Sequence, residues 1–199
     1  MFRFFKFTFK LILLLVVACG LILAYARYIE PFWVRTKEIE VPSIYVSETA
    51  NGLRIAAFAD THFGNHYSVK DFEKVIASLE KTQPDIVVFL GDLIDYFNEY
   101  IKTENIDEIS AALARIQAPY GKYAVFGNHD YGGGAQKNYE GIMTAGGFTV
   151  LVNQDVILDD QGMQIIGVDD ILIGYGDPSC AAAARPDLFT ILLCHEPDV

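Results

Sequence analysis

Short apolar segments alternate with segments of helical periodicity through the middle of the chain, and this alternation constrains the fold more than any other feature. The apolar segments span residues 53–59, 86–90 and 123–126. Between them, apolar residues recur every three or four positions over 68–83 and again over 106–118. Strands separated by helices are typical of a parallel sheet, so the sequence predicts an α/β fold.

The alternation of strands and helices ends at the Gly-Gly pair at 146–147. Shorter strands are predicted there, at 148–152, 156–158 and 164–168. Turn residues at 159–162 separate the last two of these strands. We interpret them as the start of a second sheet, mixed or antiparallel, which continues with an apolar strand at 188–194.

The first 26 residues have the composition of a membrane segment. Three basic residues precede an uninterrupted apolar run at 11–24, and no acidic residue occurs before position 30. The segment 1–26 is therefore interpreted as a transmembrane anchor or a signal segment, because Ala-Tyr-Ala at 24–26 is compatible with cleavage. We favour an uncleaved anchor in the cell membrane with the rest of the chain on the extracytoplasmic side.

Residues 27–52 differ in composition from both neighbouring regions. Aromatic, charged and β-branched residues alternate around Pro31 and Pro42, which predicts a juxtamembrane linker leading into an edge strand. Asn51 and Gly52 then predict a turn, interpreted as a hairpin. The remaining residues, 53–199, are assigned to one catalytic domain.

Charge argues against a nucleic-acid partner. Of the 15 basic residues, three lie in the membrane segment and 12 follow it, whereas all 26 acidic residues follow it, a balance of −14. A surface with this excess of negative charge repels phosphate backbones. A nuclease is therefore the least favoured kind of enzyme for this chain.

Each predicted strand of the α/β region runs directly into a polar cluster, and the carboxyl ends of such strands are where ligands bind. The clusters are Asp-Thr-His at 60–62, Gly-Asp-Leu-Ile-Asp at 91–95 and Gly-Asn-His-Asp at 127–130. His195 follows the last strand in the same way. Any one cluster alone is ordinary turn or cap chemistry. Their joint occurrence indicates a metal site.

The residue types suit that interpretation. Asp60 and His62 lie two positions apart, so their side chains share one side of an extended chain. Asp92 has two carboxylate oxygens and can bridge two ions, while Asn128 offers an amide oxygen and His195 a ring nitrogen. Hard oxygen ligands combined with imidazole suit Mn, Fe or Zn.

The order and spacing of these residues resemble the signature of calcineurin-like metallophosphoesterases. The matching motifs are Asp60-x-His62, Gly91-Asp92-x-x-Asp95, Gly127-Asn128-His129-Asp130 and His195. The resemblance implies a four-layer α/β/β/α sandwich. It also implies two divalent metal ions, one bound by Asp60, His62 and Asp92, the other by Asp92, Asn128 and His195.

The resemblance implies a different role for His129. This residue would contact the substrate phosphate and protonate the leaving oxygen, and Asp95 would orient it. The implied reaction is hydrolysis of a phosphomonoester, phosphodiester or pyrophosphate bond by a metal-bridging hydroxide. Because of the N-terminal segment, a membrane lipid or lipid precursor is a candidate phosphate ester substrate. Aromatic residues of nearby loops, Tyr131 among them, are candidate pocket residues or ordinary loop packing.

One part of the family signature is absent. The family closes its site with a later Gly-His-x-His segment, which would supply one further histidine to each metal, and this sequence has none after Val199. We therefore expect a partial domain with weak metal binding and poor hydrolysis. The alternative function is a non-catalytic, membrane-anchored binding module that retains the fold. The presence of both His129 and Asp95 argues against it, because a scaffold needs neither an acid nor its partner.

Overall fold

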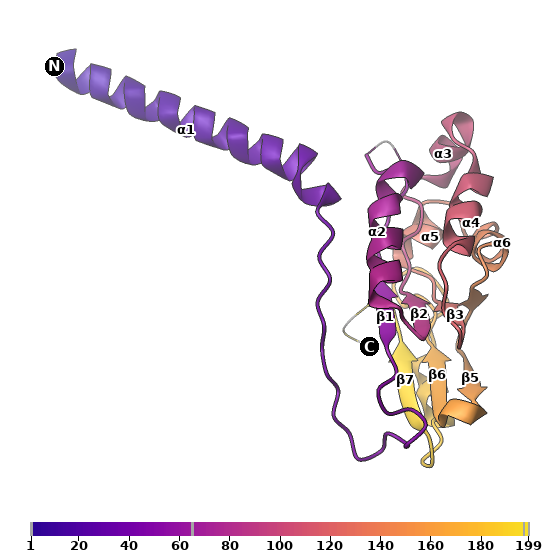
Figure 1. Ribbon diagram of the computed structural model, residues 1–199. Helices are drawn as coiled ribbons and strands as arrows, with labels where there is room; N and C mark the ends of the chain where they lie inside the picture. The colour runs from indigo at the N-terminus through magenta and orange to yellow at the C-terminus, as the bar shows by residue number, and fades with distance from the viewer. Residues whose placement is uncertain (1, 65, 197, 199) are drawn as a thin grey trace. The chain divides into compact units, whose positions relative to one another are not determined.

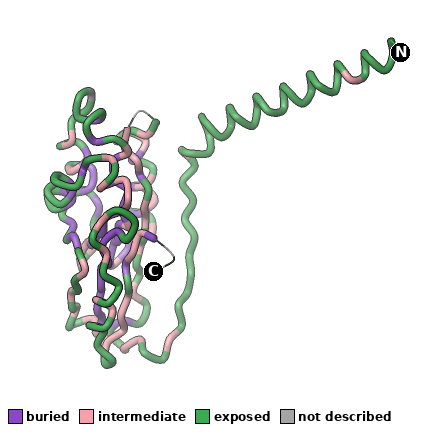
Figure 2. The backbone as a smooth tube through the Cα atoms, turned by 180° about the vertical axis from the view of Figure 1, so that it is seen from behind, coloured by how far each residue is buried: buried purple, intermediate pink, exposed green. Residues whose placement is uncertain are grey.

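The chain forms two compact units, Met1–Lys37 and Glu38–Val199. The computed structural model describes residues 2–64, 66–196 and 198. In the first unit, helix α1 (Phe2–Tyr28) is followed by the short 3-10 helix η1 (Glu30–Phe32), and α1 has no buried residue (Figure 2). The second unit holds every strand that the described residues form.

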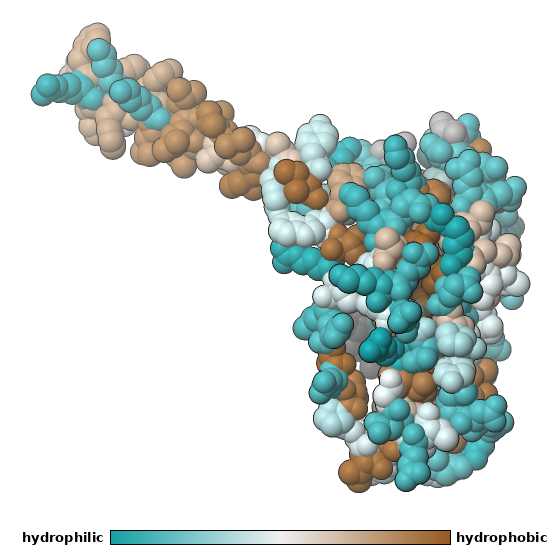
Figure 3. Space-filling model, viewed as in Figure 1, coloured by the Kyte–Doolittle hydropathy of each residue, from teal (hydrophilic) through white to brown (hydrophobic). Residues whose placement is uncertain are grey.

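Helix α1 is long and apolar enough to cross a membrane. Its 27 residues extend about 40 Å, against ~30 Å for the hydrocarbon core of a bilayer. The mean hydropathy of its most apolar window is 2.6, and apolar side chains cover most of the face of α1 that Figure 3 shows. Helix α1 is therefore a candidate transmembrane helix, in agreement with the prediction from the sequence.

The predicted edge strand within 27–52 is wrong. After η1, residues 33–43 have neither helix nor strand, and the following residues up to Gly52 contain only turns. Strand β1 is itself the outer strand of its sheet, so this segment pairs with no strand beyond it. The predicted hairpin at Asn51 and Gly52 is accordingly a turn without a strand before it.

A four-stranded parallel sheet forms the centre of the second unit. Its strands are β1 (Ile55–Phe58), β2 (Ile86–Phe89), β3 (Lys122–Ala124) and β4 (Thr149–Val150). They lie in the order β1-β2-β3-β4. The α/β prediction is confirmed, but β4 was assigned to the second sheet and instead extends the first, pairing with β3.

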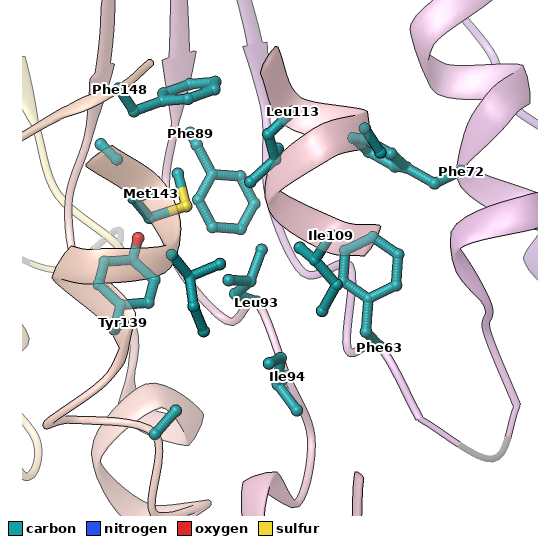
Figure 4. Packing of buried hydrophobic residues seen from close by; sticks show 14 of the residues in the cluster. Phe63, Phe72, Phe89, Leu93, Ile94, Ile109, Leu113, Tyr139, Met143 and Phe148 are labelled. Atoms are coloured by element: carbon teal, nitrogen blue, oxygen red, sulfur yellow. The ribbon is translucent and has the colours of Figure 1, made fainter. Parts of the chain in front are cut away.

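Helices pack on one face of this sheet and enclose the larger hydrophobic core (Figures 1 and 4). The helices of this unit are α2 (Val69–Thr82), α3 (Phe97–Thr103), α4 (Ile106–Ala114), α5 (Asn128–Gly132) and α6 (Tyr139–Ala145). Alternation along β2 sends Val87 and Phe89 into this core. The start of α2 is fixed by the predicted cap, in which Ser68 and Asp71 bond to each other's backbone N–H groups.

A second, mixed sheet packs on the other face of the first. It consists of β5 (Gln154–Leu158), β6 (Met163–Gly167) and β7 (Phe189–Leu193), with β5 antiparallel and β7 parallel to β6. Ile86 and Val88 of β2 meet Met163 and Ile165 of β6 in a smaller core between the sheets. The 3-10 helix η2 (Asp159–Gln161) joins β5 to β6.

The described residues therefore form three packed layers: helices, parallel sheet and mixed sheet. On the outer face of the mixed sheet, the buried Gln164 bonds to the carbonyl of Ala183 and to the N–H of Arg185. Ala183 ends the 3-10 helix η3 (Pro178–Ala183), which lies where the resemblance implied a fourth, helical layer.

Candidate metal centre

The segments that follow β1, β2, β3 and β7 meet at one edge of the two sheets. All seven residues expected at the site lie there: Asp60, His62, Asp92, Asp95, Asn128, His129 and His195. Donor atoms of Asp60, Asp92 and His195 lie within 4.8 Å of one another, as do those of His62, Asp95 and His129. The carboxyl ends of the strands thus bring together side chains that are up to 135 positions apart in the sequence.

The backbone bends sharply at three of these residues. Asp60, His62 and Asp92 have positive φ angles of 55°, 42° and 62°. These conformations are held by hydrogen bonds between the two loops, because Asp60 N–H donates to the Gly91 carbonyl and His62 N–H to the Asp92 carbonyl. Left-handed conformations cost free energy in residues other than glycine, and such strain clusters at functional sites.

Two glycines let the loops come this close. A Cβ atom on Gly91, whose φ is +94°, would overlap the backbone of Gly127. A Cβ atom on Gly127 would overlap the Asp92 carboxylate and lie 2.9 Å from Nδ1 of His195. Any larger residue at either position would push the site residues apart.

Asp92 occupies the centre of the site and is 3% exposed. Its Oδ1 accepts a hydrogen bond of 2.8 Å from the backbone N–H of His129. Its Oδ2 lies 3.4 Å from Nε2 of His62 and 3.5 Å from Nε2 of His195. One carboxylate oxygen thus faces an imidazole from each of the two expected ligand sets.

His195 provides a test of whether a cation fits here. Its Nδ1 lies 2.7 Å from the Leu90 carbonyl, which accepts only, so Nδ1 carries a proton. Nε2 then faces Oδ1 of Asn128 at 3.1 Å and the Asp92 carboxylate, so three electron-rich atoms converge. A proton on Nε2, a turned Asn128 amide or a metal cation would each relieve this contact, and the donor set suits a divalent cation.

The same neighbouring groups also determine the pKa of His195. Burial by itself lowers the pKa of this imidazole, but the Leu90 carbonyl and the Asp92 carboxylate together hold the pKa above its ordinary value. Within the described residues, the ion pairs of the site carboxylates are all with histidines rather than with Lys or Arg. The negative charge gathered here is therefore available to a cation.

His129 and Asp95 form a pair beside His62. Nδ1 of His129 lies 3.1 Å from Oδ1 of Asp95, and the two side chains are 37% and 38% exposed. The imidazole of His62 meets that of His129 edge to face, with ring centroids 4.7 Å apart. Because Asp95 engages Nδ1, the Nε2 atom of His129 remains for a substrate.

Asp130 has a structural role that the sequence did not reveal. It is fully buried, and its carboxylate accepts bonds of 2.9 Å from the backbone N–H groups of Asp92, Leu93 and Gly127. Burial raises the pKa of Asp130 to about 7, although these three donors act to lower it. The signal in the sequence was its position three residues after Gly127, which is that of an acidic residue in a capping box.

Tyr131 connects the site to the second sheet. Its hydroxyl lies 2.9 and 2.7 Å from the two carboxylate oxygens of Asp169, which follows β6 and is 1% exposed. Burial, followed by the bond to Asp169, raises the pKa of Tyr131 well above its usual range. Helix α5, which carries Asn128 and His129, is therefore tied to both sheets.

The fold and the site together define a class of protein: an α/β protein with a carboxylate–histidine centre at the ends of its strands, suited to divalent metal ions. The particular family follows from comparison with known sequences. The family described as calcineurin-like phosphoesterase matches residues 53–197, and the chain belongs to this family.

Several proteins are similar over most of this chain. YkuE of Bacillus subtilis, named an uncharacterized metallophosphoesterase, is 36% identical over 178 residues, which cover 87% of this chain and 61% of YkuE. The phosphodiesterase YaeI of Escherichia coli is 28% identical over 87% of this chain and 63% of its own length. A transmembrane protein with metallophosphoesterase domain from Bos taurus is 27% identical over 80% of this chain and 38% of its own length. The chain thus spans less than two thirds of these relatives.

Proposed function

We propose that this protein is a metal-dependent phosphoesterase that hydrolyses a phosphoester bond by direct attack of water. The observation that carries the proposal is the arrangement around Asp92, whose buried carboxylate faces histidines from both expected ligand sets. Asp60, His62 and Asp92 would hold one divalent ion, and Asp92, Asn128 and His195 a second. Two such ions, when bound, lower the pKa of water and neutralise the phosphate oxygens during in-line displacement.

His129 acts as the acid in this proposal. Oδ1 of Asp95 lies 3.1 Å from Nδ1 of His129, and this contact orients the ring. The proton on Nε2 then passes to the leaving oxygen as the bond between that oxygen and phosphorus breaks. The water oxygen forms the new bond to phosphorus, so no covalent enzyme intermediate is needed.

The substrate we propose is a phosphodiester close to a membrane. The name of the similar YaeI supports a diester, and helix α1 supports a location at the cell membrane. The proposal puts the second unit on the extracytoplasmic side. The acidic balance of the chain, −11 overall, supports a substrate other than nucleic acid.

Two substitutions in the native protein separate catalysis from metal binding. His129→Ala should lower kcat by about 10²- to 10⁴-fold, because the leaving oxygen loses its acid, while the metal content stays the same. Asp92→Ala should lose the metal, because both ions lose a shared ligand. Hydrolysis of bis-p-nitrophenyl phosphate and elemental analysis measure the two effects.

His66→Ala is the matched control, since His66 is the histidine outside the described cluster and is exposed. It should leave both turnover and metal content unchanged. Loss of metal from His129→Ala would show that His129 is a ligand and not the acid. A wild-type protein that binds metal but hydrolyses neither phosphomonoesters nor phosphodiesters would instead be a binding module.

A further inference from the structure

A loop between β6 and η3 exposes a group of large apolar side chains. Ile171, Leu172, Ile173 and Tyr175 are 38%, 69%, 56% and 81% exposed. Gly174 is the only other residue of this stretch, which we call the apolar loop (Ile171–Tyr175). Single exposed apolar residues are common, whereas a contiguous exposed group is a candidate for a binding surface.

The apolar loop is held in place by buried carboxylates. Oδ2 of Asp170 accepts bonds of 2.7 and 2.6 Å from the backbone N–H groups of Ile173 and Gly174. Oδ2 of Asp169 accepts one of 3.0 Å from the backbone N–H of Tyr175. Asp169 and Asp170 are 1% and 0% exposed. The apolar side chains are thus presented to solvent by a fixed backbone, not by a frayed segment.

The apolar loop lies beside the metal centre. A Cβ atom on Gly132 of α5 would lie 3.3 Å from Cδ1 of Ile173, and the rings of Tyr131 and Tyr175 meet edge to face at 6.4 Å. On its other side, the backbone N–H of Ile171 donates to Glu196, the residue after His195. The loop therefore contacts two of the three segments that carry site histidines, those of His129 and His195.

The chemistry of the loop favours lipid as its partner. The loop contains no Lys, Arg, Asp or Glu, so nothing in it attracts a charged protein surface or an anionic headgroup. Helix α1 of the same chain is long and apolar enough to lie in a bilayer. Residues 33–43, which have neither helix nor strand, join this helix to the second unit.

We propose that the apolar loop inserts into the surface of the membrane in which α1 is anchored, and so places the metal centre at the level of the lipid headgroups. Leu172 and Ile173 enter the acyl region, and Tyr175, an amphipathic ring, lies at the interface. If the proposed function holds, this position makes a phosphodiester in a lipid headgroup the substrate. The insertion of the loop does not depend on the proposed function.

Tryptophan fluorescence of the full-length protein in phosphatidylcholine vesicles tests the insertion. Trp33, the single tryptophan, is first replaced by Phe, and Leu172→Trp then places one reporter in the loop. Lipids with brominated acyl chains should quench this reporter at least about twofold, because quenching needs contact with the acyl region. Added salt at 0.5 M, an experimental choice, should not change the result, because the contact is apolar.

Tyr120→Trp in the same Trp33→Phe background is the control. Tyr120 is 38% exposed and precedes β3, so it lies at the end of the sheet away from the metal centre. It should remain accessible to iodide and show no quenching by brominated lipid. Equal quenching of both reporters, or none of either, would overturn the proposal.

A third outcome identifies a different partner. Protection of Leu172→Trp from iodide without quenching by brominated lipid would show that protein covers the loop, and would also overturn the proposal. Hydrolysis of the soluble bis-p-nitrophenyl phosphate by the wild-type protein in the same vesicles reports on the proposed function alone. Quenching without hydrolysis would therefore support the membrane contact while contradicting the phosphoesterase.

Discussion

Asp130 holds the backbone of the metal centre in place by hydrogen bonds, although it is not one of the expected metal ligands. Its carboxylate accepts three N–H groups, two from the loop after β2 and one from Gly127 before α5. One of them belongs to Asp92, whose carboxylate in turn accepts the N–H of His129. A single buried side chain thus fixes the distance between the central carboxylate and the helix that carries the acid.

Asp130→Asn should destabilise this arrangement although the two side chains are nearly equal in size. The amide has one oxygen and must turn its NH₂ group toward at least one backbone N–H, which leaves a buried donor unpaired. We expect the free energy of unfolding of the metal-free protein to fall by about 1–3 kcal/mol, measured by urea denaturation. We also expect weaker metal binding, measured by titration.

Asp160→Asn is the matched control for this change, because Asp160 is exposed and lies in η2, away from the site. Its unfolding free energy should change by less than about 0.5 kcal/mol. Equal stability of the Asp130→Asn and wild-type proteins would contradict the role we assign to the three N–H bonds.

Helix α5 is the element on which the proposed chemistry depends. It has only five residues, too few to be stable alone, and it carries both Asn128 and His129. Its position is set by bonds to residues outside it, because Asp130 accepts the N–H groups of Asp92 and Leu93, and Tyr131 donates to Asp169 beyond β6. The geometry of the acid therefore depends on contact between the two sheets.

Tyr131→Phe removes that contact and retains the ring. We expect kcat to fall by roughly tenfold or less with unchanged metal content, because α5 becomes less well positioned. The free energy of unfolding should fall by about 1–2 kcal/mol. Steady-state kinetics with elemental analysis and urea denaturation check both expectations.

Tyr96→Phe is the control for the loss of a hydroxyl, since Tyr96 is 62% exposed. It should leave kcat and stability near those of the wild type. If Tyr131→Phe also left kcat unchanged, α5 would be positioned without help from the second sheet.

Local patterns predicted the elements whose residues interact with near neighbours. The spacing of apolar residues and the Ser68 cap predicted α2, and the apolar runs predicted β1, β2 and β3. Local patterns could not predict which distant strands pair with each other. The two-residue strand β4 was assigned to the wrong sheet because so short a strand carries no signal for its partner.

The same distinction applies to the site. The expected ligands could be proposed because each follows a strand within a short motif, and the structure places them at one edge of the sheets. Their grouping differs from the expected sets, because Asp60 clusters with Asp92 and His195, and His62 clusters with Asp95 and His129. The supporting contacts were missed because they join residues far apart, as Tyr131 and Asp169 are, 38 positions from each other. The positive φ angles at Asp60 and Asp92 were also unpredictable, because aspartate adopts this conformation more often than most residues but only at a minority of its positions.

At the scale of the whole molecule, an apolar helix and a phosphoesterase-type unit belong to one chain. The second unit has two cores, one under the helices (Figure 4) and one between the sheets, and the metal centre lies where both sheets end. Relatives such as YkuE are longer, since this chain spans 61% of YkuE. The central claim therefore has to be measured on the native full-length protein.

The most direct test is hydrolysis of bis-p-nitrophenyl phosphate by the native protein with and without Mn²⁺, alongside the Asp92→Asn variant. We predict hydrolysis that a chelator abolishes and Mn²⁺ restores, and none from Asp92→Asn, because that change removes the carboxylate shared by both expected ligand sets. Hydrolysis that survives both the chelator and Asp92→Asn would contradict the assignment of the metal centre as the active site.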